Sequence, residues 1–187
     1  THMKALFNPA SVAVIGASDK PDKLGFHVMK SLTQGGYPGR IFPVNPGTQE
    51  IMGLTAMPSV SACDGGVDLA IVVVPAGRVP GVFRECAAAG VKGIVLITAG
   101  FKEIDDPGGA VLHEEIALIA DGAGIPVIGP NTFGMINLMA DLNASFTPEF
   151  SLLKKGAISL VSQSGGISHL LGFLAMRMDM GFRMIVG

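Results

Sequence analysis

Short apolar runs recur along the sequence and alternate with longer segments of helical length. Five runs consist mainly of Val, Ile, Leu and Ala, with turn-forming residues at or just after their ends: residues 11–16, 40–45, 68–74, 93–98 and 126–129. Continuous runs of this kind predict strands buried on both faces, as in a parallel sheet. The segments of helical length lie at residues 25–35, 78–90 and 109–123. The alternation predicts an α/β domain with a doubly wound parallel sheet and right-handed crossovers.

The periodicity fades after the fifth run, and a second, shorter pattern follows it. Polar residues and Pro148 indicate a linker over residues 131–150. Beyond it we expect a strand, a turn, a helix and a strand, at residues 157–162, 163–166, 167–178 and 182–187. One β-α-β unit cannot cover its own faces, so we expect the chain to be part of a longer protein.

These patterns divide the chain into three segments. Residues 1–3 resemble a cloning remnant, because they lack the long apolar core of a signal peptide. Residues 4–145 are predicted to form the first domain, and residues 146–187 the truncated start of a second.

The charge balance excludes several classes of partner. The 13 Lys and Arg residues are balanced by 15 Asp and Glu residues, which gives a net charge of −2 without any basic run. Nucleic-acid binding needs a positive footprint, so a nucleic-acid partner is not expected.

No apolar run reaches the length of about 18 residues that a transmembrane helix needs, so we expect no membrane partner.

The cysteines and histidines predict no metal site. Cys63 and Cys86 lack metal-ligand spacing and form no disulfide framework, which favours a reducing, cytoplasmic setting. His27 and His113 fall on predicted helices and are expected to be ordinary surface or core residues. No pair of histidines has the spacing of metal ligands.

The turn after the first run has the residues of a phosphate site. Gly16-Ala17-Ser18-Asp19 is followed by Lys23-Leu24-Gly25 at the start of a predicted helix. A glycine at a strand end lets the backbone approach an anion, and the helix N-terminus offers unpaired N–H groups with a partial positive charge. The alternative is a glycine turn that only packs the helix on the sheet.

This turn departs from the dinucleotide-binding fingerprint in two places. Ser18 stands where G-x-G-x-x-G requires glycine, and Asn45 ends the second run, where an acidic residue would hold the ribose. NAD is therefore disfavoured, while an unusual adenine nucleotide stays open.

The other candidate turns lie at later strand ends. Residues 74–77, 98–101 and 129–131 are expected to meet at one edge of the sheet, which suits a long phosphorylated ligand. The turn at residues 162–166 opens the later helix, where Ser162 or Ser164 can cap the N-terminus next to a phosphate. It lacks the first glycine of the nucleophile elbow G-x-S-x-G, and no Ser-His-acid arrangement is evident, which argues against a hydrolase.

Taken in order, these segments resemble the CoA-binding half of NDP-forming acyl-CoA synthetases. The segments are FNP (7–9), SVAVIGAS (11–18), KLG (23–25), PVNP (43–46), VP (74–75), ITAGF (97–101), GPN (129–131), DLNA (141–144) and SQSG (162–165). The pattern is most similar to ADP-forming acetyl-CoA synthetase α subunits and more distantly to the succinyl-CoA synthetase α subunit. The resemblance covers residues 5–187 and implies a Rossmann-like CoA-binding domain followed by the first β-α-β unit of a flavodoxin-like ligase domain.

The resemblance also implies roles for individual residues. The CoA phosphates would be held by the turn from Ser18 through Asp19 and Lys20 to Pro21 and by Lys23, Leu24 and Gly25, with Gly16 and Ala17 also against the cofactor. The adenosine would meet Val44, Asn45 and Pro46, with its purine against Val74 and Pro75. The pantetheine arm and thiol would lie along Ile97, Thr98, Ala99, Gly100 and Asn131.

In the second unit the resemblance implies a phosphate-stabilising turn. Ser162, Ser164 and Gly165 match the helix start that steadies a phosphohistidine loop. His169 stands where succinate-handling relatives have a tyrosine beside the acyl phosphate, so it is a candidate for the substrate side and argues against succinate.

The implied reaction converts an acid, CoA and ATP into acyl-CoA, ADP and phosphate through an acyl phosphate and a phosphohistidine. The phosphohistidine loop and the ATP-grasp part that binds Mg and ATP would lie outside this chain, in a fused domain or a β subunit. The chain alone is therefore expected to bind CoA without completing the reaction.

Two other functions stay open. One is a CoA-sensing regulatory domain, such as that of a protein lysine acetyltransferase. The other is a nucleotide-dependent oxidoreductase, which Asn45 disfavours.

The lone β-α-β unit also predicts self-association into a homo-oligomer.

Overall fold

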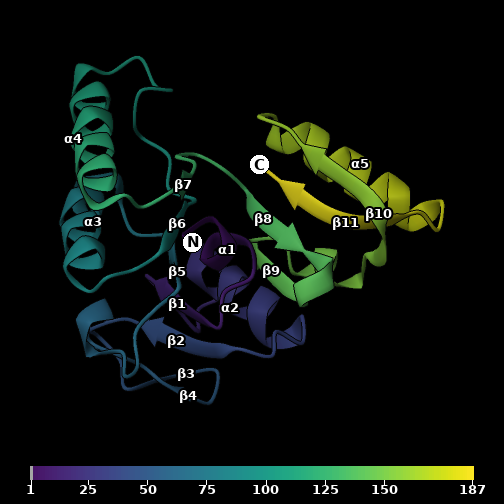
Figure 1. Ribbon diagram of the computed structural model, residues 1–187, viewed down its shortest axis with the longest axis horizontal. Helices are drawn as coiled ribbons and strands as arrows, with labels where there is room; N and C mark the ends of the chain where they lie inside the picture. Colours follow the sequence, from purple (N-terminus) through teal and green to yellow (C-terminus); the bar gives the residue numbers. More distant parts are fainter. Residues whose placement is uncertain (1) are drawn as a thin grey trace.

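The computed structural model describes residues 2–187, and its central feature is a five-stranded parallel sheet (Figure 1). The strands are β1 (Ser11–Ile15), β2 (Arg40–Val44), β5 (Leu69–Val72), β6 (Gly93–Leu96) and β7 (Val127–Ile128), in the order β2-β1-β5-β6-β7. Counted along the chain, this order is 2-1-3-4-5, a common doubly wound arrangement. The predicted α/β fold and its five strands are confirmed.

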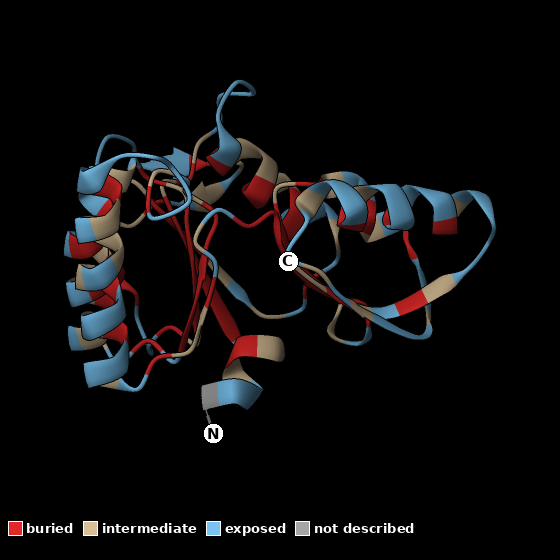
Figure 2. Cartoon of the chain, turned by 90° about the horizontal axis from the view of Figure 1, so that it is seen from above, coloured by how far each residue is buried: buried red, intermediate tan, exposed pale blue. Residues whose placement is uncertain are grey.

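Helices cover both faces of this sheet. They are α1 (His2–Phe7), α2 (Leu24–Gln34), α3 (Val79–Ala88) and α4 (Pro107–Ala123). Along β1, Ala13 and Ile15 join the core under α3 and α4, whereas Val12 and Val14 join the core under α1 and α2. Burial on both faces explains why the strands are apolar without interruption, and Figure 2 shows them buried between exposed helix surfaces.

A short hairpin follows β2 and was not predicted. It consists of β3 (Glu50–Ile51) and β4 (Leu54–Thr55), joined by Met52 and Gly53, which both have positive φ. The 3₁₀ turns η1 (Val60–Ala62) and η2 (Ala76–Arg78) precede β5 and α3, respectively. The hairpin places Ile51 beside the end of β2, where it lines a cavity described below.

The prediction of an irregular linker over residues 131–150 is wrong. This segment forms β8 (Gly134–Asn137), η3 (Leu138–Ala140), β9 (Leu142–Ser145) and η4 (Pro148–Leu152). All residues of β8 and β9 are buried, so the polar/apolar alternation of a half-exposed strand is missing. The buried polar residues that suggested a linker are hydrogen-bonded: Asn143 Nδ2 donates to the Thr147 carbonyl oxygen (3.0 Å) and to Ser151 Oγ (2.9 Å).

The predicted β-α-β unit is present beside this hairpin. β10 (Lys154–Val161), α5 (Gly165–Arg177) and β11 (Gly181–Val186) follow one another, and β10 and β11 are parallel. β11 also pairs antiparallel with β8, which gives a second sheet in the order β10-β11-β8-β9. Much of this unit faces solvent: Leu170 on α5 is 62% exposed, and Val161 at the end of edge strand β10 is 79% exposed.

The β8–β9 hairpin lies between the cores of the two sheets and packs on both. Met135 and Leu142 belong to the core under α1 and α2, whereas Ile136 belongs to the core of the second sheet. Asn137 Nδ2 donates to the Phe7 carbonyl oxygen (2.9 Å) and so joins the hairpin to α1. The second sheet therefore lies beyond the α1–α2 side of the first, opposite α3 and α4 (Figure 1).

Within residues 2–187, none of the helices is both long and apolar enough to cross a membrane. The same residues contain no group of three or more His, Cys, Asp and Glu side chains placed to hold a metal ion.

Asp68 joins three segments at the amino end of the sheet. Its carboxylate accepts hydrogen bonds from the Ala10 backbone N–H (2.8 Å) and from Lys92 Nζ (2.7 Å). Burial raises the pKa of the Asp68 carboxyl, but these bonds and the charges of Lys92 and Arg40 outweigh that effect. The pKa of Asp68 is therefore below its ordinary value of 3.8.

We predict that Asp68→Asn lowers the free energy of unfolding at pH 7 by on the order of 1 kcal/mol, because the amide loses the ion pair with the exposed Lys92. A depressed folded-state pKa stabilises the fold above the unfolded-state pKa, and this contribution disappears as the pH falls through the folded-state value. Denaturant unfolding should therefore show a difference that shrinks below about pH 4. Asp105→Asn, at an exposed carboxylate, is the control, and a difference independent of pH would contradict the assignment.

Candidate functional site

The turn between β1 and α2 brings a helix N-terminus onto the end of a strand. Gly16 has φ +95°, which favours glycine. A Cβ on Gly25, in the first turn of α2, would overlap the carbonyl oxygen of Gly16. Gly16 is therefore required by its backbone conformation and Gly25 by the close packing of the helix on the strand end. This packing is the alternative that the sequence left open for the turn, and the contact with an anion stays a prediction.

Two backbone N–H groups at the start of α2 are left available by the local hydrogen bonds. The Phe26 N–H donates to the Lys23 carbonyl oxygen (3.1 Å), whereas those of Leu24 and Gly25 have no partner within residues 2–187. Lys23 is the N-cap residue, and its side chain makes no capping hydrogen bond. Ser18 Oγ accepts from the Lys20 N–H (3.0 Å) and shapes the loop before the helix. An uncapped helix N-terminus carries a partial positive charge and can bind an anion.

A cavity of about 800 Å³ lies over this turn. It is lined by Gly16, Ala17, Ser18, Asp19, Lys20, Asp22, Lys23, Leu24, Gly25, Asn45, Gly47, Thr48, Ile51 and Val73. Of the residues predicted to lie against the phosphates, all except Pro21 are in this set. Charges of both signs surround the cavity, and Lys23 pairs with Asp22 at 3.4 Å.

Asn45 connects the first turn to the second. Its Nδ2 donates to the Ala17 carbonyl oxygen (2.9 Å), and its Oδ1 accepts from the Gly47 N–H (2.8 Å). The side chain at the position of the ribose-binding carboxylate of dinucleotide-binding domains is therefore engaged within the protein. Asn45 fixes the wall of the cavity with its amide group.

A smaller cavity of about 250 Å³ adjoins the first, and the two share Gly16, Asn45 and Val73. Its other lining residues are Ile15, Val44, Pro46, Pro58, Ser59, Val74, Pro75, Arg78, Val82 and Glu85. All five residues predicted to meet the adenosine lie here, at the carboxyl ends of β2 and β5. Proline and valine side chains give this cavity largely apolar walls.

The end of β6 lies next to that of β5, and the end of β7 lies next to that of β6, but the residues after these two strands line neither of the two cavities. Thr98 Oγ1 donates to the Val74 carbonyl oxygen (2.7 Å), and the Asn131 N–H donates to the Thr98 carbonyl oxygen (3.0 Å). Ile97 is buried in the core, whereas Ala99 and Asn131 are exposed. The predicted pantetheine residues are thus brought together at the same edge.

The backbone N–H of Gly100 is already bonded. Glu103 Oε1 accepts from Gly100 (2.7 Å), and Glu103 Oε2 accepts from the Phe101 N–H (3.1 Å). Burial raises the pKa of Glu103, but these bonds dominate and hold the pKa below its ordinary value. An ionised carboxylate of the protein itself therefore occupies the anion-binding groups of this turn.

The turn of the second unit is formed by its own serines. Ser164 is the N-cap of α5 and accepts from the Ile167 N–H (3.3 Å), while Ser162 Oγ accepts from the Ser164 N–H (3.1 Å). The predicted capping is confirmed, with Ser164 as the cap. Neither these residues nor Gly165 lines the two cavities at the first turn.

Both ring nitrogens of His169 have partners inside the protein. Nδ1 lies 2.7 Å from the Gly165 carbonyl oxygen, which can only accept, so this nitrogen carries the proton. Nε2 lies 2.7 Å from Thr147 Oγ1. The ring also stacks against Phe146 and contacts Phe150. This packing connects α5 to the loop after β9.

Several lining residues were not predicted from the sequence. They are Asp22, Gly47, Thr48, Ile51 and Val73 in the larger cavity, and Ile15, Pro58, Ser59, Arg78, Val82 and Glu85 in the smaller one. Val73 could have been found, because it lies in the same apolar run as Val74. Ile15, Asp22 and Gly47 likewise adjoin predicted residues in the sequence. Ile51, Pro58, Ser59, Val82 and Glu85 lie on separate segments that meet the others only in the folded chain.

Comparisons with known proteins agree with this geometry. Residues 10–137 match the family described as a CoA binding domain. The alpha subunit of ADP-forming acetate–CoA ligase II of Pyrococcus furiosus is 43% identical over 178 residues, which cover 94% of this chain and 37% of that protein. An ADP-forming acetate–CoA ligase of Methanocaldococcus jannaschii is 40% identical over 184 residues, covering 98% of this chain and 25% of that protein.

A solved structure is similar along nearly the whole chain. It is the dinucleotide forming acetyl-coenzyme A synthetase 1 of Ca. Korarchaeum cryptofilum in complex with phosphate and ADP, with a TM-score of 0.92 and 39% identity. The match covers 99% of this chain and 39% of that one. The chain thus spans between a quarter and two fifths of the length of these relatives.

We predict that Gly25→Ala weakens CoA binding by more than about tenfold and lowers the midpoint of thermal unfolding, because the added Cβ forces α2 away from the Gly16 carbonyl. Calorimetry and thermal unfolding measure the two effects. Gly122→Ala is the matched control, because that glycine is also helical and has open space around it. Unchanged affinity in Gly25→Ala would refute the assignment of the phosphate turn.

Proposed function

Because the chain belongs to the CoA-binding domain family, we propose that it is the coenzyme A-binding part of an ADP-forming acyl-CoA synthetase. The observation that carries the proposal is the pair of adjoining cavities at the switch between β1 and β5. The larger lies over an uncapped helix N-terminus, and the smaller has apolar walls. These are the two environments that a diphosphate and an attached purine require.

The two cavities support the following proposed positions for the groups of CoA. The diphosphate lies over the turn from Gly16 to Gly25, against the N–H groups of α2. The purine lies between Pro46 and Pro75 in the smaller cavity. The pantetheine arm then continues along residues 97–100 towards Asn131, following the hydrogen-bonded strand ends.

The chain alone supplies only part of the reaction of the whole protein. We propose that the whole protein converts an acid, CoA and ATP into acyl-CoA, ADP and phosphate, with an ATP-grasp domain or β subunit that binds Mg and ATP. The N-terminus of α5, with Ser162, Ser164 and Gly165, would stabilise the phosphoryl group as it passes through a phosphohistidine. His169 positions this turn through its bond to Gly165.

The runner-up is a CoA-sensing regulatory domain, which would bind CoA through the same cavities. The downstream part of the whole protein decides between the two. A glycine-flanked histidine loop and an ATP-grasp segment support the synthetase, whereas a fused acetyltransferase supports the regulatory domain.

We predict that the chain binds CoA and does not bind NADH tightly, because Asn45 uses both ends of its amide within the protein and offers no carboxylate to the hydroxyl groups of the adenine-side ribose. Isothermal titration calorimetry with the two ligands at equal concentration measures this. Tight NADH binding without CoA binding would overturn the proposal and favour an oxidoreductase.

We also propose a cytoplasmic setting. Cys63 and Cys86 are free thiols, and both are buried. Burial raises the pKa of Cys63 to about 11 and that of Cys86 to about 12, so both stay protonated near neutral pH. Free, unpaired cysteines are typical of a reducing compartment.

Self-association of the chain stays a prediction. The edge strand β10 and the outer face of α5 expose apolar side chains, including Val161, Ile167 and Leu170. Apolar surface of this kind favours contact with a second copy. Sedimentation velocity over a range of concentrations should show a dimer that Leu170→Glu reduces, and a monomer at every concentration would contradict the prediction.

A further inference from the structure

Arg78 lines the smaller cavity, and its guanidinium forms no hydrogen bond or ion pair within residues 2–187. It ends the 3₁₀ turn η2, directly before α3, and its side chain is exposed. It also lines a neighbouring groove of about 510 Å³ between α3 and α4.

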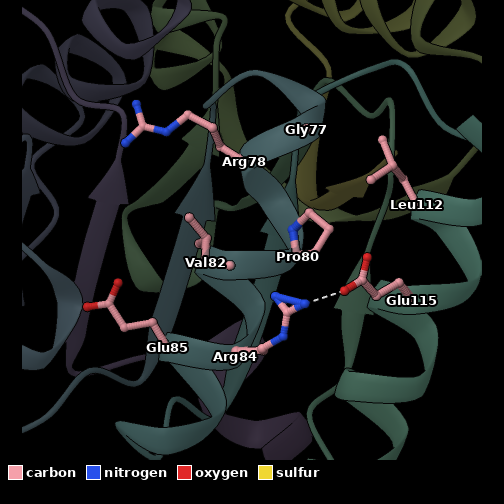
Figure 3. Close-up of a pocket in the computed structure, with 9 residues that line it drawn as sticks. Gly77, Arg78, Pro80, Val82, Arg84, Glu85, Leu112 and Glu115 are labelled. Carbon is pink, nitrogen blue, oxygen red and sulfur yellow. Dashed lines mark hydrogen bonds and ion pairs between the residues drawn. The ribbon is translucent and has the colours of Figure 1, made fainter. Parts of the chain in front are cut away.

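The other charged groups nearby are already engaged. Arg84 lies six residues further along the chain, in α3, and forms an ion pair with Glu115 across the groove. Glu85 accepts from the N–H (3.1 Å) and the hydroxyl (3.2 Å) of Ser61. Figure 3 shows Arg78 extending away from Arg84 and Glu115, on the side of the groove where Glu85 also extends.

Arg78 is also the only cationic residue among those that line the smaller cavity. The lysines of the site, Lys20 and Lys23, line the larger cavity, and Lys23 shares its charge with Asp22. A ligand that places its diphosphate over α2 and its purine in the smaller cavity has its ribose near their shared wall, at Gly16, Asn45 and Val73. For a further anionic group on that ribose, Arg78 is the cation that the smaller cavity offers.

CoA carries such a group, the 3′-phosphate of its ribose, and dephospho-CoA lacks it. We propose that Arg78 is a specificity-determining residue that contacts this 3′-phosphate and so selects CoA over dephospho-CoA. The inference rests on the proposed function. Guanidinium is suited to this role, because its planar set of N–H donors matches the oxygens of a phosphate.

The volume of the smaller cavity agrees with this assignment. At about 250 Å³ it is smaller than the range of about 300–1,000 Å³ typical of pockets that enclose a whole drug-sized ligand. A cavity of this size suits a purine rather than a whole nucleotide, so the ribose phosphate would lie outside it. Arg78 lines both this cavity and the neighbouring open groove.

The experiment compares CoA and dephospho-CoA as ligands of the unaltered chain, of Arg78→Gln, of Arg78→Lys and of the control Arg84→Gln. Affinities are measured by calorimetry at two salt concentrations, and thermal unfolding checks that each variant is folded. Glutamine keeps hydrogen-bonding groups but removes the charge, and Arg84 is a neighbouring arginine that does not line the smaller cavity.

We expect Arg78→Gln to weaken CoA binding by about tenfold or more, since one charge-assisted contact is lost. Its affinity for dephospho-CoA should change less than about twofold, Arg78→Lys should recover part of the preference, and Arg84→Gln should leave both affinities unchanged. The preference for CoA should also weaken at high salt.

Two results would overturn the inference while leaving the proposed function intact. One is equal affinity of the unaltered chain for CoA and dephospho-CoA. The other is an equal loss for both ligands in Arg78→Gln, which would place the guanidinium on the purine or the diphosphate. A chain that binds neither ligand overturns the proposed function and this inference together.

Discussion

The close approach of α2 to the end of β1 is the constraint on which the geometry of the site depends. Gly25 can pack against the Gly16 carbonyl only because it has no Cβ. The helix N-terminus therefore lies directly on the strand end, with its unpaired N–H groups towards the larger cavity. Asn45 then joins the end of β2 to the same turn through its bond to Ala17. The positions of the two cavities follow from these two contacts.

The β8–β9 hairpin extends this rigidity to the second sheet. Met135 packs in the core under α1 and α2, and Ile136 packs in the core of the second sheet. Two neighbouring residues of β8 therefore belong to different cores. At the far end of that sheet, the Ser162 N–H donates to the Val186 carbonyl oxygen (3.0 Å). The turn before α5 is thus fixed relative to β11, which pairs with β8. Thr147 and His169 add a contact between the loop after β9 and α5.

The sequence predicted those parts of the fold in which local pattern and burial agree. Five strands of the first sheet and helices α2, α3 and α4 were expected close to their observed bounds, because burial on both faces leaves a continuous apolar run. The β8–β9 hairpin was missed because Asn143 and Ser145 are polar yet fully buried, where hydrogen bonds to each other and to Thr147 and Ser151 satisfy them. The β3–β4 hairpin has only two residues per strand, too few to show a period.

The candidate site was predictable to the extent that it depends on backbone geometry. Gly16 and Gly25 were found because a tight strand–turn–helix connection restricts the residues it accepts, whereas Asn45 was named as a contact only through the resemblance to the synthetase family. Ile51, Val82 and Arg78 were not found, because each lies on an element that reaches the cavities only through tertiary packing. The sequence also gave no sign that Glu103 would take the N–H groups of Gly100 and Phe101.

The net charge of −2 bears on how this chain can hold a ligand with several negative charges. The larger cavity is lined by Lys20 and Lys23 but also by Asp19 and Asp22, so its side chains supply little net positive charge. The start of α2 supplies about half an elementary charge through backbone N–H groups whose positions are fixed. Affinity for the diphosphate can therefore come from the backbone, independently of side-chain charge. A single unpaired cation such as Arg78 can then provide selectivity for a further phosphate, because no other cation competes for it at the smaller cavity.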